Sequence, residues 1–401
     1  MLLGRATAEG TRCYSERHRK DCVPDHFRES GDLIVSSIGI GTYLGEPDEQ
    51  TNALVTEAVI ESVRRGVNLI DSAINYRYQH SERSVGKGIQ RLVESGEASR
   101  DELIICTKGG FLAHSNHSQA DSFYQQYVER SNSELNMTDL IAGQHCIHPE
   151  FLREQINGSL TNLGVQTIDV YYIHNPEIQL SEVAPEIFYN RLRAAFEVME
   201  EAADAGKISA YGLATWHGLR VPPTANDHLD LARAKSLAQE VTLNKEDRFR
   251  FIQFPLNMAM PEALIAPTQK LGEEQIPVLE AAYRLGITPI ASNSLCQAQV
   301  VGKIPENIAS ACGDDLRTDG QRALQYTRSA PGLLTALVGM KAIEHIEENL
   351  ALTAVPPLGR KNFQELTHLI VGVLKSMHRG SDNWTFDVSN LSYSSGIPLR
   401  A

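Results

Sequence analysis

Short apolar runs alternate with helical patterns along most of this chain. Between the runs, apolar residues recur at helical spacing, as in Thr51–Arg65, Ser81–Glu94, Pro149–Leu163 and Leu192–Ala205. Alternation of this kind is typical of βαβ units and a parallel sheet. Strand character is found at 36–42, within a segment from 33 to 43, and at 67–71, 103–108, 168–174, 208–213, 250–254, 287–291 and 333–339.

Eight strands are the number that closes a (β/α)8 barrel. The rival α/β fold is a doubly wound sheet, but no Gly-x-Gly-x-x-Gly segment follows the first strand, as a dinucleotide-binding unit of that kind requires. We therefore predict a TIM barrel over residues 33–351 with a long insertion at 111–149 after the third strand. Residues 1–32 and 352–401 are predicted to be N- and C-terminal extensions.

The charge and the polarity of the chain exclude several classes of partner. The 401 residues carry a formal net charge of −13 and no basic stripe, which argues against nucleic acid and anionic membrane surfaces. No apolar run reaches the roughly 18 residues of a membrane helix, so we expect a cytoplasmic protein. Histidines at 114, 117, 145 and 148 form no closed four-ligand pattern, and we predict a polar loop rather than a metal site.

Four residues with complementary chemistry follow the ends of three successive predicted strands. Asp71, Lys108 and His174 end apolar runs, and Tyr76 lies five residues after Asp71. A phenol has an ordinary pKa of about 10, so a catalytic tyrosine needs a nearby cation, and a buried lysine needs a carboxylate to stay charged. Any one such residue is more often structural. Together they suit hydride addition to a carbonyl, with the phenol donating the proton and His174 binding the oxygen.

Further motifs lie along the chain around these four residues. The motifs are Gly66–Ala73 with Tyr76, Ser81–Gly86, Thr107-Lys108, Ser159–Gly164 leading into Ile168-Asp169 and His174, and Gly339–Lys341 followed by Glu348-Asn349. Spread over residues 33–350, they resemble the aldo-keto reductase family. The resemblance implies that Asp71, Tyr76, Lys108 and His174 form the catalytic tetrad, with Tyr76 as the general acid.

The resemblance also implies a nicotinamide dinucleotide, NADP with NAD as the alternative, bound extended across the barrel mouth. Gln253 is expected to bond the carboxamide, and Lys341 and His345 are the candidates to hold a 2′-phosphate. Thr215 and Ser292 stand where the family often has a serine and a ring-stacking tyrosine. The implied cofactor-binding residues are Gly41, Thr42, Asp71, Thr215, Gln253, Ser292, Gly339, Lys341 and His345, with Glu348 and Asn349 at the adenine end.

We therefore expect an oxidoreductase that reduces a small-molecule aldehyde or ketone. The alternative is a barrel that binds NADPH but serves as a regulatory or scaffold subunit, as some relatives do. A phosphate-handling isomerase would need a glycine-rich, phosphate-binding loop after the seventh and eighth strands. Residues 293–296 contain no glycine. The polar insertion, with Phe111, Phe123, Tyr124 and Tyr127, is expected to cover the substrate. The sequence specifies neither the substrate nor the oligomeric state.

Overall fold

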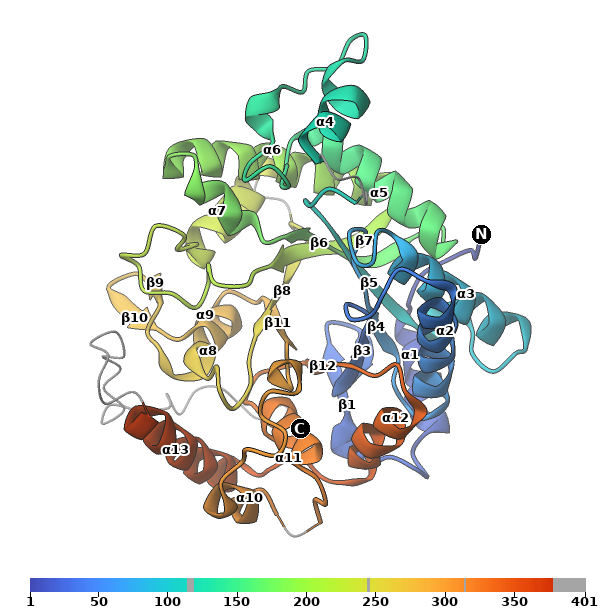
Figure 1. Ribbon diagram of the computed structural model, residues 1–401, viewed down its shortest axis with the longest axis vertical. Coiled ribbons are helices and arrows are strands. Elements are labelled where there is room, and N and C mark those ends of the chain that lie inside the picture. The colour runs from blue at the N-terminus through green and yellow to red at the C-terminus, as the bar shows by residue number, and fades with distance from the viewer. Residues whose placement is uncertain (114–118, 244–245, 314, 378–401) are drawn as a thin grey trace.

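The computed structural model describes residues 1–113, 119–243, 246–313 and 315–377. Eight parallel strands form a closed barrel, and helices surround it (Figure 1). This confirms the predicted (β/α)8 fold. Around the barrel the strands are β3 (Ile38–Gly41), β4 (Leu69–Asp71), β5 (Ile104–Gly109), β6 (Ile168–His174), β7 (Ile208–Ala214), β8 (Phe249–Pro255), β11 (Thr288–Ser292) and β12 (Thr335–Gly339).

The helices follow the strands as the periodicity predicts. Asp48 caps the first of them by accepting a hydrogen bond from the Thr51 amide over 2.7 Å, and Gly164 ends the helix after the insertion in a left-handed conformation. The α-helices are α1 (Ala8–Arg17), α2 (Glu49–Arg64), α3 (His80–Glu94), α4 (Gln119–Phe123), α5 (Pro149–Leu163), α6 (Pro185–Asp204), α7 (Leu231–Val241), α8 (Glu262–Ile265), α9 (Val278–Arg284), α10 (Glu306–Ala311), α11 (Asp319–Arg328), α12 (Ile343–Leu350) and α13 (Arg360–Met377).

The segment predicted as one strand from 33 to 43 is divided in two at Ser37. Its first half is β2 (Leu33–Ser36), which pairs antiparallel with β1 (Phe27–Ser30), and only β3 enters the barrel. A second small hairpin, β9 (Gln269–Leu271) with β10 (Glu274–Ile276), lies between α8 and α9. Hydrophobic alternation alone could not show the division, because both halves are apolar and adjacent in sequence.

The N-terminal segment closes the end of the barrel opposite the mouth. The Ala6 amide donates to Oδ1 of Asp169 over 2.7 Å, and Arg100 pairs with Oδ2 of the same carboxylate at 2.8 Å. Ala6 and Val35 join a buried apolar cluster with barrel residues such as Leu69. In Figure 1, α1 and β1 are drawn pale, on the side of the barrel away from the viewer. The first thirty residues therefore contribute to the core.

The described part of the insertion forms a small core of its own. Phe123 and Tyr127 pack against Phe151 of α5, with ring centroids 6.1 and 5.0 Å apart. In Figure 1 this segment stands out beyond α5 and α6. Phe123 and Tyr127 are thus buried inside the insertion and do not face the mouth. The cluster comprises Leu112, Phe123, Tyr127, Leu135, Leu140, Cys146 and Phe151.

The C-terminal segment also packs on the barrel's outer layer. The Phe363 ring of α13 stacks on Tyr326 of α11, with centroids 5.1 Å apart. Within residues 1–113, 119–243, 246–313 and 315–377, no helix combines the length and the apolar character that crossing a bilayer requires.

Candidate active site

Strand alternation directs the predicted site residues into the barrel. Side chains two apart on a strand share a face, and Leu69, Cys106, Tyr172 and Phe251 belong to one buried cluster inside the barrel. Two residues further along each strand come Asp71, Lys108, His174 and Gln253, at or near the carboxyl ends of β4, β5, β6 and β8. Four residues from different strands therefore converge on the barrel mouth.

Asp71 and Lys108 form a fully buried ion pair. The Lys108 ammonium donates to Oδ2 of Asp71 and, over 2.7 Å, to the Ser72 carbonyl oxygen. Burial lowers the pKa of Lys108, but the Asp71 carboxylate and the Tyr76 phenol together raise that pKa above its ordinary value. Burial raises the pKa of Asp71, whereas Lys108 and the Gln253 amide stabilise its charged form. Asp71 and Tyr76 therefore favour the charged form of Lys108 in the site.

Tyr76 lies in the loop after β4, beside this pair. The Lys108 Nζ is 4.8 Å from the centre of the Tyr76 ring, and the Tyr43 ring packs edge-on at 5.0 Å. Burial raises the pKa of Tyr76, Lys108 lowers it, and Asp71 raises it, with a net rise. Lys108 thus makes the phenol more acidic than burial alone would, as expected, but desolvation outweighs the cation and the net pKa lies above the ordinary value. The phenol stays protonated at neutral pH, as a proton donor must be.

A constrained turn holds Tyr76 in place. The next three residues, Arg77, Tyr78 and Gln79, all have positive φ values of 47°, 53° and 73°, a conformation that non-glycine residues seldom adopt. The buried Arg77 side chain secures the turn: its Nε donates to Ser81 Oγ over 3.0 Å and its Nη1 to Asn52 Oδ1 over 3.1 Å. Strained backbone supported in this way is common at functional sites.

His174 completes the group. Its ring packs edge-on against Tyr76 and Phe111, with centroids 5.7 and 4.9 Å away. Burial, Lys108 and His145 all lower the pKa of His174, so the imidazole is neutral. Within the described residues its buried Nδ1 has no hydrogen-bond partner. Because an unpaired buried N–H is costlier than an unpaired lone pair, we assign the single proton to Nε2, which can donate to a substrate oxygen.

The residues predicted to contact the nicotinamide end lie at neighbouring strand ends. Gly41 and Gly339 face each other in the β3–β12 register, while Thr42 Oγ1 contacts the Asp71 carbonyl oxygen at 3.1 Å. The buried Thr215 Oγ1 has no partner among the described residues, and Ser292 ends β11. The Gln253 amide nitrogen donates to Asp71, so a bond from Gln253 to a carboxamide, which stays a prediction, would use the amide oxygen. The residues predicted for this end are Gly41, Thr42, Asp71, Thr215, Gln253, Ser292 and Gly339.

The residues predicted for the adenosine end follow β12. Lys341 and His345 are exposed near the start of α12, and Lys341 Nζ is 3.4 Å from the Cβ position of a side chain built on Gly45. Lys341 therefore reaches the loop after β3. Glu348 accepts a hydrogen bond from the Thr318 hydroxyl, and Asn349 is buried. The roles of these residues toward an adenine remain predictions.

Sequence reasoning missed the contacts made by His145 and Glu177. His145, set aside as one member of a polar loop, is fully buried against the His174 carbonyl. The Glu177 carboxylate accepts hydrogen bonds from the amides of Trp216 and His217 over 2.6 and 3.0 Å, and so fixes the loop that carries Thr215. A buried histidine within a polar segment has no sequence signature that separates it from an exposed one.

The insertion histidines do not gather around a metal in the described chain. His114 and His117 lie outside the described residues. His148 caps α5 by accepting from the Glu150 amide, and burial raises the pKa of the Cys146 thiol to about 12, which disfavours a thiolate ligand. Within the residues that the structure describes, no three His, Cys, Asp or Glu side chains are grouped to hold an ion.

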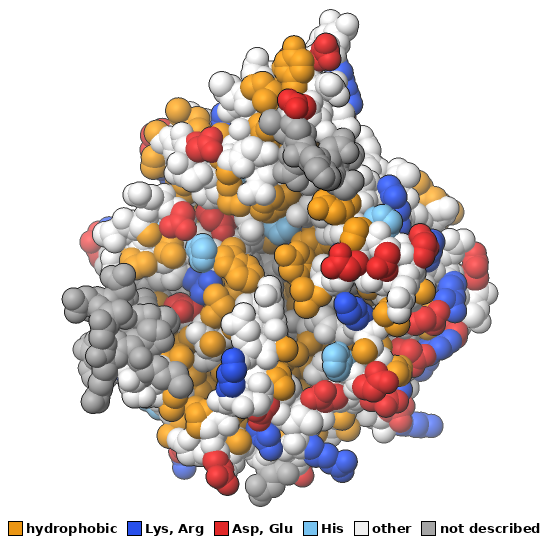
Figure 2. Space-filling view, viewed as in Figure 1, with side chains coloured by type: hydrophobic (Ala, Val, Ile, Leu, Met, Phe, Trp, Pro, Cys, Tyr) orange, Lys and Arg blue, Asp and Glu red, His pale blue; other side chains and the backbone are white. Residues whose placement is uncertain are grey.

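The face of the molecule that carries the mouth is apolar at its centre. Figure 2 shows hydrophobic side chains gathered around the middle of this face, over the barrel. Tyr43, Leu44 and Trp216 are large apolar side chains of the strand-end loops that remain exposed, by 56%, 50% and 37%. Exposed aromatic surface beside convergent polar groups is typical of a small-molecule site.

Comparisons with known proteins agree with this arrangement. A sequence profile of the aldo/keto reductase family matches residues 37–221. The chain is 28% identical over 191 residues to the NADH-specific methylglyoxal reductase of Escherichia coli, covering 46% of this chain and 49% of that protein. It is 27% identical over 295 residues to an aldo-keto reductase of Bacillus subtilis, covering 71% of this chain and 66% of the relative. The matches thus span about half to two thirds of these relatives.

Solved structures share the fold. An aldo/keto reductase from Klebsiella pneumoniae, crystallised with NADP and acetate, superposes with a TM-score of 0.57 at 18% identity, covering 87% of this chain and 96% of that one. A thermostable aldo-keto reductase in complex with the inhibitor epalrestat gives 0.57 at 19% identity, over 86% and 99%. The family profile over residues 37–221 and the relatives thus all resemble one family: the chain is similar to aldo-keto reductases in sequence, and it shares their fold.

Proposed function

We propose that this protein is an NAD(P)H-dependent oxidoreductase that reduces an aldehyde or ketone to an alcohol, with Tyr76 as the general acid. The observation that carries the proposal is the buried Asp71–Lys108 pair beside Tyr76 and His174 at one barrel mouth. A fixed cation next to a protonated phenol suits a reaction in which negative charge develops on a carbonyl oxygen.

The mouth also fits a nicotinamide dinucleotide. Among the described residues the buried Thr215 hydroxyl has no hydrogen-bond partner, and Gln253 uses its amide nitrogen for Asp71, so the Thr215 hydroxyl and the Gln253 oxygen can bond an amide. Gly41 and Gly339 leave room at adjacent strand ends. When bound, the dinucleotide supplies the hydride. The E. coli relative is specific for NADH, whereas the Klebsiella structure contains NADP. The exposed side chains of Lys341 and His345 support NADP for this chain, because both can donate hydrogen bonds to a 2′-phosphate.

Side chains of the protein bind the carbonyl and supply the proton. The neutral His174 donates a hydrogen bond from its Nε2–H to the substrate oxygen and so orients the carbonyl. Tyr76 then transfers its proton to that oxygen, and Lys108 stabilises the phenolate left behind while Asp71 keeps Lys108 charged. The apolar rim with Tyr43 and Trp216 excludes water from the reacting carbonyl.

NADPH consumption across aldehydes, ketones, sugars and quinones tests the proposal, with NADPH binding followed by fluorescence in the same samples. We expect binding and turnover of at least one class. Binding without turnover of any class would overturn the enzyme proposal in favour of an NADPH-binding regulatory barrel. Absence of both would overturn the cofactor assignment as well.

A further inference from the structure

One buried histidine of the insertion, His145, contacts His174 of the predicted tetrad. The His145 ring is fully buried, and its Nε2 lies 2.6 Å from the carbonyl oxygen of His174. Phe111 packs edge-on against both histidine rings, with centroids 5.0 and 4.9 Å away. A Cβ on Gly110 would lie 2.9 Å from His145 Nε2 and 3.0 Å from the His174 oxygen, so glycine is required for this approach.

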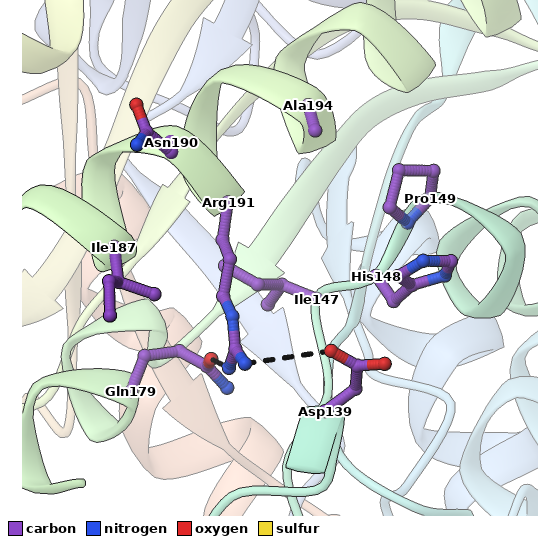
Figure 3. A pocket seen from close by; sticks show the side chains of 9 residues that line it. All are labelled: Asp139, Ile147, His148, Pro149, Gln179, Ile187, Asn190, Arg191 and Ala194. Carbon is purple, nitrogen blue, oxygen red and sulfur yellow. Dashed lines mark hydrogen bonds and ion pairs between the residues drawn. The ribbon is translucent and has the colours of Figure 1, made fainter. Parts of the chain in front are cut away.

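Arg191, Gln179 and His145 form a chain of hydrogen bonds, and the Arg191 side chain determines the direction of each bond. Arg191 of α6 can only donate, and its Nη1 lies 2.6 Å from Gln179 Oε1, as Figure 3 shows. The Gln179 amide must therefore present its nitrogen to His145, 2.9 Å from Nδ1. Nδ1 is then an acceptor. Because burial lowers the pKa of His145 to about 4, the neutral ring carries its one proton on Nε2.

We propose that His145 is a positioning residue for His174: the relay Arg191–Gln179–His145 keeps the His145 Nε2–H directed at the His174 carbonyl and so sets the position of the substrate-binding imidazole. This rests on the proposed reductase function for its catalytic consequence. His174 ends β6, and Asn175 after it has a positive φ of 43°, so the backbone there departs from the strand. The hydrogen bond from His145 stabilises the backbone where it leaves the strand.

An exposed site on the same insertion provides the matched control. His145→Leu removes the donor at similar volume, His145→Gln keeps a donor near the Nε2 position, and Gln125→Ala alters an exposed residue. We expect His145→Leu to lower kcat/KM roughly tenfold, the loss of about one buried hydrogen bond, with the NADPH Kd unchanged within about twofold. His145→Gln should recover most of the loss, and Gln125→Ala should match wild type.

Two further measurements separate positioning from folding. In a His174→Ala background, His145→Leu should cause no additional loss, since it acts through His174. Gln179→Glu, which is nearly isosteric, replaces the amide donor with an acceptor. It should move the His145 proton to Nδ1, which leaves no Nε2–H for the His174 carbonyl, and should lower kcat/KM as His145→Leu does.

Nitrogen-15 shifts of labelled histidines report the tautomer without any turnover. We expect a neutral Nε2–H ring for His145 between pH 5 and 8, identified by its loss in His145→Leu. An Nδ1–H tautomer, additive losses in the double variant, or no effect of Gln179→Glu would overturn the proposal. If the wild type turns over no carbonyl, the reductase function fails, whereas the nitrogen shifts still decide the relay.

Discussion

The Nε2 of Gln253 on β8 donates to Oδ1 of Asp71 on β4 over 2.8 Å, across 182 residues of sequence. The other carboxylate oxygen of Asp71 accepts from Lys108, so both sides of the buried acid are satisfied. A buried charge is tolerated only when it is paired and hydrogen-bonded. Gln253 therefore supports the ion pair directly, in addition to any contact it makes with a cofactor.

Replacing Gln253 with Met should destabilise the protein. The variant keeps the side-chain length but leaves Oδ1 of Asp71 unpaired, so we expect a loss of about 1.5–3 kcal/mol in the free energy of unfolding. Urea unfolding at pH 7 measures it, with Gln125→Ala as the surface control. Stability equal to wild type would mean that water or another group replaces the amide.

Replacing Tyr76 with Phe should abolish most turnover without affecting cofactor binding. The phenol is the proton donor in the proposed reaction, and the ring stays in contact with Tyr43 and His174. We expect turnover to fall at least roughly 100-fold, the lower end for loss of acid–base catalysis. NADPH fluorescence titration serves as the folding control. Near wild-type turnover by this variant would remove Tyr76 from the role.

Replacing Lys341 with Ala should weaken NADPH more than NADH. The exposed ammonium can make charge-assisted hydrogen bonds to a 2′-phosphate that NADH lacks. Wild type should accordingly bind NADPH more tightly than NADH, and the variant should lose most of that preference. Fluorescence titrations with both cofactors measure the two dissociation constants. An equal loss for both would show that the phosphate is recognised elsewhere.

Replacing residues 114–144 with a short Gly-Ser connection should impair turnover of the carbonyl substrate and leave NADPH affinity unchanged. The insertion starts just after Lys108, and its Phe111 ring lies against His174. A segment that covers the substrate predicts a higher KM or lower turnover at unchanged NADPH affinity. Some loss of stability is also expected, because Leu135 and Leu140 cover Phe151. Unchanged kinetics would leave the segment without a part in catalysis.

The stability of the fold should fall in mild acid because of His26. Its Nδ1 lies 3.1 Å from Ser37 Oγ and its Nε2 2.9 Å from the Gly66 oxygen, and burial lowers its pKa to about 3. The unfolded chain binds this proton near pH 6.5 and the folded chain near 3, so stability is lost as pH falls through that window. Between pH 7 and pH 5 the loss from this group is about 2 kcal/mol.

Urea unfolding at the two pH values measures that loss. His26→Gln retains a donor for the Gly66 carbonyl but cannot titrate, so its stability should depend less on pH by the same amount. An identical pH dependence in wild type and variant would contradict the assignment of a neutral, buried His26.

Local pattern was enough to place the barrel and its four central residues. Period-two alternation identifies which residues of a strand face inward, and Asp71 follows Leu69 on β4 just as Lys108 follows Cys106 on β5. Because all eight strands run parallel, their carboxyl ends meet at one mouth, and residues far apart in sequence converge there.

Tertiary structure alone decided the partners of these residues. Gln253 contacts Asp71, and His145 contacts His174, only because the barrel closes and Gly110 lets the insertion return to β6. The pKa of Tyr76 likewise depends on a balance between burial and the distance to Lys108, which no residue spacing encodes. Periodicity is a local property of the chain, whereas hydrogen-bond partners and desolvation depend on how distant segments pack, and so only the folded chain determines them.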